Sequence, residues 1–302
     1  MPAPLQILRH ESALGHWEMV RRAPPPALAG LVAGTYCGWT ESMSPGPIRR
    51  ELPTTKIPVI FNFGASYRIG GAGASIDDAE PLDSFVAGPY ESFAETQSTG
   101  PTSGVQVDLT PLGAYRLLGM PLADIAGRGA PLEDVLPDGR TLVPRLAEAR
   151  GWEARFRIID EALLAGLARA REPARPVVEA WRRLESTGGN TSIGSLASAA
   201  GWSRKHLIES FRRHLGMAPK RLARVLRFGR FSERLHGAAK IDWISLALDS
   251  GYYDQAHLIR DCHDFAGCTP RGLLARRLPE GGWLGGSVES ERRHAPVTVE
   301  RG

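Results

Sequence analysis

A duplicated segment constrains this chain more than any other feature of its 302 residues. The segment KHLIESFRRHLGMAP, residues 205–219, returns 51 positions later as AHLIRDCHDFAGCTP, residues 256–270. Each copy keeps His-Leu-Ile, a glycine nine residues after the leucine and a proline three residues after that glycine. Because glycine followed by proline is typical of the end of a helix, each copy predicts one short helix.

A second pair of segments extends the duplication toward the N-terminus. SLASAAGWS (195–203) and SLALDSGYYD (245–254) share Ser-Leu-Ala and a glycine followed by an aromatic residue. Glycine adopts the left-handed backbone that ends a helix, so each unit predicts a helix, a turn and a second helix. Polar residues that can cap a helix N-terminus precede the predicted helices: Thr191-Ser192, Ser203, Asp242 and Asp254.

Charge is divided unevenly along the chain. Residues 1–173 hold 16 Lys and Arg against 20 Asp and Glu, a net charge of −4. Residues 174–278 hold 18 against 9, a net charge of +9, and residues 279–302 hold 3 against 4. A basic block beside an acidic one is typical of a nucleic-acid-binding module joined to a different domain.

One amphipathic helix is predicted between the two units, over residues 219–237. At 1.5 Å per residue, about 18 residues span roughly 27 Å. Basic residues lie outside its apolar stripe: Lys220, Arg221, Arg224, Arg227, Arg230 and Arg234. We expect some of these side chains to reach DNA phosphates and the others to form a solvated face.

Residues 176–275 resemble the DNA-binding domain of AraC/XylS-type transcription regulators. The second unit carries that family's signature almost in full: a small-residue first helix, a Gly-aromatic turn, an Asp-Gln-x-His start and a Gly-x-Thr-Pro end. The resemblance implies an all-α domain with two helix-turn-helix units, whose second helices enter successive major grooves. At Cys262 the family usually has Phe, so we expect looser packing under the second recognition helix.

The resemblance also implies which side chains read DNA. Base-reading positions of the family match Lys205, Ile208 and Glu209 in the first unit, and Gln255, Ala256 and Arg260 in the second. Arginine pairs with guanine and glutamine with adenine in bidentate fashion, whereas a carboxylate can only accept, as from cytosine. The full predicted DNA-binding set is Ser203, Arg204, Lys205, Ile208, Glu209, Arg212, Gln255, Ala256, Arg260 and His263. We expect His206 and His257 to pack or to position the helix.

The first 173 residues predict strands followed by helices. Segments rich in β-branched and aromatic residues stand between turn residues at 57–64, 67–70, 84–90 and 104–109. Helices are predicted at 110–119 and 152–170, and the second carries an apolar stripe. This order is typical of an α+β domain. It is similar to the effector domains of the same regulators, small cupin-like β-barrels followed by helices that pack on the barrel or dimerise.

Aromatic residues on the predicted strands are the candidates for an effector pocket. They are Tyr36, Trp39, Phe61, Phe63, Tyr67, Phe85 and Tyr90. The alternative is that these rings form the plain core of the barrel.

Reactive groups of the kind that enzymes use are sparse in the first 173 residues. His10 and His16 are the two histidines there, and both lie outside the strands predicted above. A histidine-rich metal site is therefore not expected, nor is a cofactor. Gly-x-Ser-x-Gly and phosphate-binding Gly-Lys-Ser/Thr motifs are absent from the sequence, so we expect no catalysis.

These observations predict a cytoplasmic transcription regulator, activator or repressor, with three parts. Residues 1–173 sense an effector or dimerise, 174–278 bind double-stranded DNA, and 279–302 form a disordered tail. No apolar run is long enough for a membrane span, no secretory signal is visible, and three cysteines without a CxxC motif favour reduced thiols. We expect a small-molecule effector, with a homodimer and, for an activator, RNA polymerase as further partners. The alternative keeps DNA binding but makes the first domain a ligand-free oligomerisation or protein-interaction module.

Overall fold

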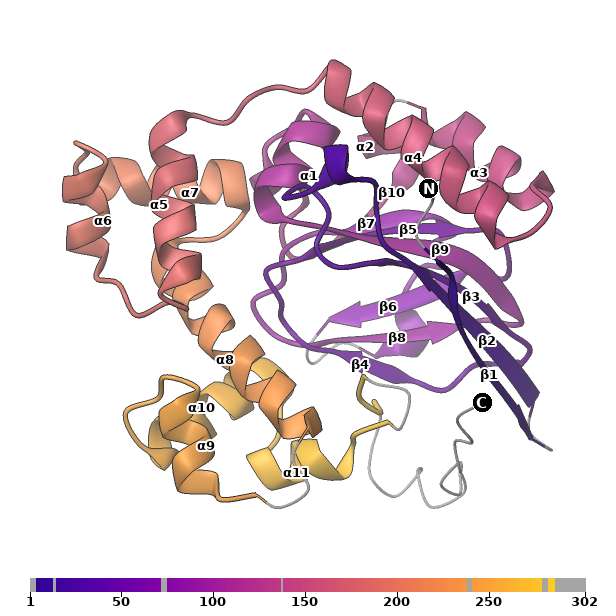
Figure 1. Cartoon of the computed structure of the whole chain (residues 1–302). Helices are drawn as coiled ribbons and strands as arrows, with labels where there is room; N and C mark the ends of the chain where they lie inside the picture. Colours follow the sequence, from indigo (N-terminus) through magenta and orange to yellow (C-terminus); the bar gives the residue numbers. More distant parts are fainter. Residues whose placement is uncertain are drawn as a thin grey trace.

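The computed structural model describes residues 4–12, 15–71, 75–136, 138–237, 241–278 and 282–285. Figure 1 shows a β-rich part built from the first half of the chain, with helices above it, and a purely helical part beside it. The strands are β1 (Gln6–Ser12), β2 (Gly15–Arg22), β3 (Tyr36–Glu41), β4 (Arg49–Glu51), β5 (Ile57–Asn62), β6 (Tyr67–Gly71), β7 (Phe85–Ala87), β8 (Ala94–Ser98), β9 (Thr102–Leu109) and β10 (Gly129–Pro131).

The strands form two antiparallel sheets. Seven strands form the larger sheet in the order β1-β2-β3-β9-β5-β7-β10, and three form the smaller sheet in the order β4-β8-β6. Successive side chains of a strand point to opposite faces, so each face of the larger sheet has its own set of residues. Val105 and Val107 of β9 are fully buried on the face covered by helices, whereas Gln106 and Asp108 line a cavity on the other face.

Helices cover one face of the larger sheet. They are α1 (Pro111–Leu118), α2 (Leu132–Val135), α3 (Gly139–Glu148) and α4 (Trp152–Ala168), with short 3-10 turns η1 (Pro26–Leu28) and η3 (Leu122–Ile125). A further 3-10 turn, η2 (Ile76–Asp78), lies against β6 and β8 of the smaller sheet. Phe156, Ile159 and Leu163 of α4 are buried in the core below, and Leu167 packs at its edge. The stripe predicted for this helix therefore packs on its own barrel, the first of the two expected arrangements.

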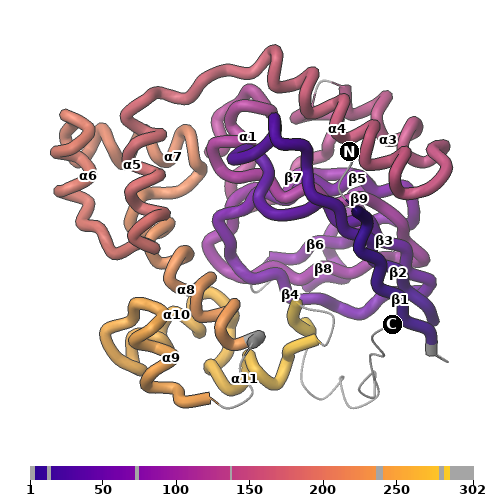
Figure 2. Tube along the Cα trace, in the orientation of Figure 1, coloured from indigo at the N-terminus to yellow at the C-terminus, as the bar shows by residue number. Residues whose placement is uncertain are grey.

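The helical part begins after a short connection that follows α4, and Figure 2 traces this connection across the top of the molecule. It contains α5 (Arg175–Ser186), α6 (Ile193–Ala199), α7 (Arg204–Leu215), α8 (Pro219–Gly237), α9 (Trp243–Asp249), α10 (Gln255–Ala266) and α11 (Pro270–Ala275). Trp181, Phe211, Phe228, Phe231 and Phe265 are fully buried in a second core. In the described part of the chain, no helix is long and apolar enough to cross a membrane.

Two predictions need correction. The strand predicted at 84–90 is confined to 85–87, because Gly88 and Pro89 follow and proline cannot donate to a β-ladder. Residues 282–285, inside the predicted disordered tail, are ordered against β4: Arg50 N donates to Trp283 O at 2.7 Å, and Gly285 N to Ile48 O at 2.9 Å. The remainder of that tail, 279–281 and 286–302, lies outside the described residues.

Candidate nucleic-acid interface

The two helix-turn-helix units are capped as their sequences predict. Side-chain oxygens of four residues accept hydrogen bonds from backbone N–H groups in the first turn of the helix that follows: Ser192 for α6, Ser203 for α7, Asp242 for α9 and Asp254 for α10. Ser203 accepts from His206 N at 3.1 Å, and Asp254 from His257 N at 2.7 Å. Both recognition helices, α7 and α10, therefore begin at fixed points.

The turns of the two units share one hydrogen bond. Trp202 N donates to Ala197 O at 2.9 Å, and Tyr252 N donates to Ala247 O at 3.0 Å. The preceding residues, Gly201 and Gly251, have φ angles of 67° and 91°, which only glycine adopts without strain. The same backbone bond in both turns indicates that the sequence duplication is also a structural one.

A histidine packs against the aromatic residue of each turn. The rings of Trp202 and His206 lie edge to face with centroids 4.4 Å apart, and those of Tyr252 and His257 do so at 5.1 Å. The prediction that these histidines pack and position the helix is consistent with this geometry. Each pair joins the turn to the first residues of the recognition helix.

The side chains predicted to read DNA are open to solvent. Nine of the ten are exposed, and Ile208 is half-buried. In the first unit, Lys205 Nζ lies 4.0 Å from Glu209 Oε1, one helical turn away, so part of the Glu209 charge is offset. The N-terminal domain covers none of the nine exposed side chains, and their DNA contacts stay a prediction.

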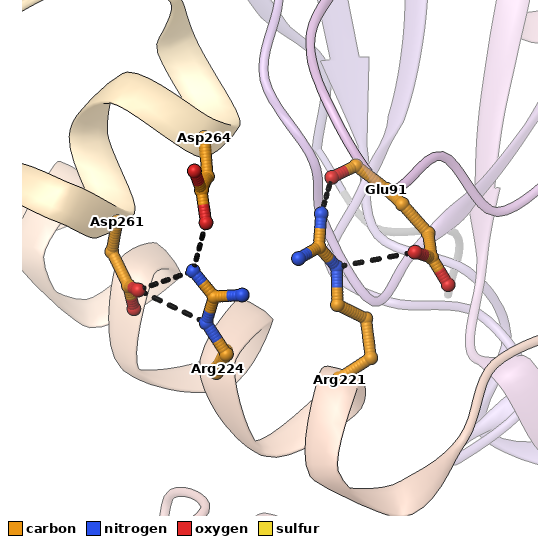
Figure 3. Close-up of polar contacts among 5 residues, drawn as sticks. All are labelled: Glu91, Arg221, Arg224, Asp261 and Asp264. Carbon is orange, nitrogen blue, oxygen red and sulfur yellow. Dashed lines mark hydrogen bonds and ion pairs between the residues drawn. The ribbon is translucent and has the colours of Figure 1, made fainter.

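Four of the arginines on α8 bind protein groups. Arg227 Nη1 donates to Gly189 O at 3.3 Å, and Arg230 donates to Gly188 O, which ties α8 to the end of α5. Arg224 binds Asp261 and Asp264 of α10, and Arg221 binds Glu91 (Figure 3). The expected phosphate contacts of this helix are thus left chiefly to its two exposed cations, Lys220 and Arg234.

Cys262 lies in the second core with no exposed surface. Burial raises the pKa of this thiol, so it stays protonated at neutral pH. Its neighbours in this core include Phe228 and Phe265, whose ring centroids are 5.1 Å apart. The looser packing expected from a cysteine at this position stays a prediction.

Residues 196–276 match the family model of a helix-turn-helix domain, and this range spans both units and α8. These residues form an AraC-type helix-turn-helix domain, a DNA-binding domain of transcription regulators. Residues 20–131 match a second model, a domain of unknown function (DUF6597), which covers the larger part of both sheets. A search of curated proteins finds no sequence match to this regulator.

Solved structures with a similar course of the chain are distant in sequence. ToxT from Vibrio cholerae is 8% identical with a TM-score of 0.45, over 91% of the regulator and 98% of ToxT. ToxT bound to an unsaturated fatty acid is 8% identical with a TM-score of 0.43, over 80% and 96%. The AraC-like transcriptional activator CuxR is 14% identical with a TM-score of 0.26, over 69% and 79%. All three TM-scores are below 0.5, so these structures add no argument of their own.

A cavity of about 630 Å³ lies in the N-terminal part of the regulator, between the two sheets. Its walls hold ring and apolar side chains together with charged ones. The rings come from Trp17, Trp39, Tyr67, Phe85, Tyr90 and Trp283. The charged groups include two ion pairs, Glu41 with Arg49 at 3.5 Å and Asp108 with Lys56 at 3.7 Å.

The predicted effector-binding residues divide between this cavity and the core. Trp39, Tyr67, Phe85 and Tyr90 line the cavity. Tyr36 and Phe61 point to the helix-covered face and are buried, with the Tyr36 ring 5.9 Å from that of Phe156. Phe63 packs at the edge of the same core, with the Arg155 guanidinium 4.7 Å from its ring centre. Strand alternation accounts for the division, since Tyr36 and Trp39 are three residues apart on β3.

Three rings form a row along the cavity wall. The centroids of Trp39 and Tyr67 are 6.5 Å apart and those of Tyr67 and Phe85 are 6.2 Å apart, both edge to face. Burial raises the pKa of Tyr67 to about 12, so its hydroxyl stays a hydrogen-bond donor at neutral pH. The predicted aromatic set omitted Trp17 and Trp283, which also line the cavity. Trp17 stands on the cavity-facing register of β2, which alternation could have indicated, whereas Trp283 joins the wall only through the tertiary fold.

The described residues contain no group of three or more His, Cys, Asp or Glu side chains placed to hold a metal ion. The arrangement found instead is a pair of solvent-exposed recognition helices and a separate cavity lined by rings and ion pairs.

Proposed function

We propose that this regulator binds a double-stranded operator with both recognition helices and that a small molecule in the cavity controls it. The observation that carries the DNA-binding part is the duplicated unit. The two copies share their caps, turn hydrogen bond and ring pair, and both present exposed polar side chains at the start of the second helix. In a helix-turn-helix, these N-terminal side chains are the ones that meet base edges.

The cavity supports the effector part. Its volume is in the range of small-molecule sites, and its wall combines rings with a few polar groups that could fix an orientation. A compound with a flat apolar body and a polar end fits this lining. No catalytic step is required, because a ligand acts by binding one arrangement of the protein better than another.

A selection experiment tests the DNA-binding part. Purified regulator is mixed with a library of duplexes that hold about 30 random base pairs, and the bound fraction is sequenced after several rounds. We expect a motif of two short blocks with centres about 10 base pairs apart, the spacing of successive major grooves. Recovery of sequences with no shared block would contradict sequence-specific binding.

A thermal-shift screen against a metabolite library tests the effector part. A ligand at 100 times its Kd adds about 2.7 kcal/mol to the free energy of unfolding. The matched variants are Phe85→Ala, which removes a ring from the cavity wall, and Arg140→Ala, which changes an exposed surface residue. A true cavity ligand loses its shift in the first variant and keeps it in the second. If no compound in the library shows this behaviour, the result would favour the alternative in which the N-terminal domain is a ligand-free interaction module. A homodimer and an RNA polymerase contact stay predictions.

A further inference from the structure

The smaller sheet lies between the cavity and the second helix-turn-helix unit. On β4, Arg49 and Glu51 line the cavity, and Arg50 between them points to the opposite face. On β8, Ala94 and Thr96 line the cavity in the same way, and Glu95 points away. Arg50 and Glu95 are direct partners in the β4–β8 ladder. One three-residue strand thus has the cavity on one face and the helical domain on the other.

Arg50 binds the C-terminal end of the second recognition helix. It is 8% exposed, its Nη2 lies 2.7 Å from Glu95 Oε1, and its Nη1 donates to Ala266 O at 2.9 Å. Its guanidinium lies 4.2 Å from the ring centre of Phe93. Ala266 is the last residue of α10, where carbonyl groups lack helical partners and carry partial negative charge. The N-terminal domain therefore supplies a charged cap to a helix of the DNA-binding domain.

Two arginines of α8 contact the same end of α10, and Figure 3 shows Arg224 bound to Asp261 and Asp264 of that helix. Arg224 Nη2 lies 2.6 Å from Asp261 Oδ1 and also binds Asp264, and Asp261 is buried. The guanidinium groups of Arg221 and Arg224 lie 4.6 and 4.9 Å from the ring centre of Phe265. Arg221 also binds Glu91, which follows the cavity residue Tyr90. We call Arg50, Arg221 and Arg224 with their partners on α10 the α10 clamp.

Among the described residues, the first unit has no equivalent of this clamp. At the matching positions, 51 residues earlier, Ser210, Arg213 and His214 replace Asp261, Asp264 and Phe265. Helix α7 rests instead on α1 and η3, none of whose residues lines the cavity, with the His214 ring 4.7 Å from that of Tyr115. Pro89, next to the cavity residue Gly88, touches the end of α7 at Gly216. The duplication therefore provides an internal comparison between a clamped and an unclamped recognition helix.

We infer that Arg50 is a positioning residue for DNA reading by the second unit, and that the cavity wall acts on α10 through it. This inference rests on the proposed function. Helix α10 has 12 residues, about 18 Å, so a tilt about its C-terminal end displaces Gln255 at the other end and, by a smaller amount, Arg260 at the middle of the helix. Hydrogen bonds to bases require donor–acceptor distances near 2.7–3.2 Å. A displacement of about 1 Å therefore removes base discrimination in the second block of the operator.

The random-duplex selection described above tests this inference with variants of the full chain. The block read by α10 is first identified as the one that changes in Arg260→Ala. In Arg50→Ala, we expect the base preferences of that block to fall at least tenfold, with the block read by α7 unchanged. Arg50→Lys is expected to behave similarly, because one ammonium cannot hold Glu95 and Ala266 O in the planar geometry of a guanidinium. Arg140→Ala, an exposed arginine of the N-terminal domain paired with Glu133, is the control and should match the wild type.

If Arg50→Ala does not fold, the variant Glu95→Gln provides a second test of the same positioning role. It keeps Arg50 in place and removes the charge that orients it, so the same selective loss should appear at smaller size. Equal weakening of both blocks, or no change in either, in a folded variant would overturn the positioning role. A wild-type protein that selects no motif would instead overturn the proposed function itself, and the inference with it.

Discussion

Arg260 and Arg204 are two exposed arginines near the start of the recognition helices, yet we expect Arg260 to contact bases and Arg204 to contact phosphates. Arg260 is on the first turns of α10, at a position expected to meet base edges. The Arg204 guanidinium lies beside Gly194 of α6, at the junction of two helices, where phosphates are the expected partners.

Arg260→Ala should relax specificity at one base pair, with a loss of about 1–3 kcal/mol in discrimination, because a bidentate arginine–guanine contact is of that size. Arg204→Ala should weaken binding to all sequences alike and reduce the slope of log K against log salt by about one. Titrations of both variants on the selected operator and on random DNA, at several salt concentrations, measure the difference. Equal losses on both DNAs for Arg260→Ala would contradict its assignment.

Gly201 and Gly267 end helices with the same φ of 67° and differ in what surrounds them. A Cβ at Gly201 would meet open space, whereas a Cβ at Gly267 would lie 2.5 Å from Phe93 Cε1. Gly201→Ala should cost about 1–2 kcal/mol of unfolding free energy, the penalty of a left-handed residue. Gly267→Ala should cost more and should also disturb the contact between the two domains. Chemical denaturation of both variants checks the order, and a smaller loss for Gly267→Ala would contradict it.

Single residues show where sequence reasoning succeeds and where it stops. The four caps and the turn glycines were predictable because each depends on residues one to four positions away. The cavity was half predictable, because alternation on β3 and β5 separates Trp39 from Tyr36 and Phe61 once the strand register is known. The partners of Arg50 were not predictable, because Ala266 is 216 positions away and no local pattern joins them.

Helix α8 is the element that connects the two units, and its bounds agree with the sequence prediction, residues 219–237. Its amphipathic period predicts one continuous helix, with Pro219 at its first position and Gly237 at its last. The partners of its arginines were not predictable in this way. A basic helix face in a DNA-binding domain suggests phosphate contacts, whereas four of its six cations bind carbonyl or carboxylate groups of the protein. The hydrophobic period of a helix sequence indicates which face is buried, but it does not indicate which group a charged side chain binds.

Arg224→Ala should destabilise the helical domain by about 3–5 kcal/mol, because it leaves the Asp261 carboxylate, whose side chain is 2% exposed, without its cation. Arg234→Ala is the matched control on the same helix, because Arg234 is exposed, and should change the free energy of unfolding by less than about 0.5 kcal/mol. Urea denaturation of both variants measures the difference. The double variant Arg224→Ala/Asp261→Asn should regain part of the lost unfolding free energy, which would confirm that the buried Asp261 charge causes the loss. Equal stability of Arg224→Ala and Arg234→Ala would contradict this explanation.

In the whole molecule, the helical domain is more predictable from the sequence than the domain that contains the two sheets. The helical domain follows from a duplication, caps and a family resemblance. The two sheets do not follow as directly: β2, β3, β4 and β8 mix polar and apolar residues, because one face of each lines a cavity with charged walls. The Gly-rich sequence around 282–285 has no periodicity and therefore predicts a tail. It is ordered by hydrogen bonds to β4, which is remote in sequence.

The spacing of the units leads to a prediction for the whole protein on DNA. Helix α8 has 19 residues and spans about 28 Å, comparable with the 34 Å repeat of a duplex. Hydroxyl-radical footprinting on the selected operator should therefore show two protected patches about 10 base pairs apart on one face of the duplex. The double variant Gln255→Ala/Arg260→Ala should lose the patch of the second unit and keep that of the first, because each unit docks through its own recognition helix. Two protected patches on opposite faces of the duplex in the wild-type footprint would contradict this prediction. So would the loss of both patches in the double variant at a protein concentration that saturates the first unit.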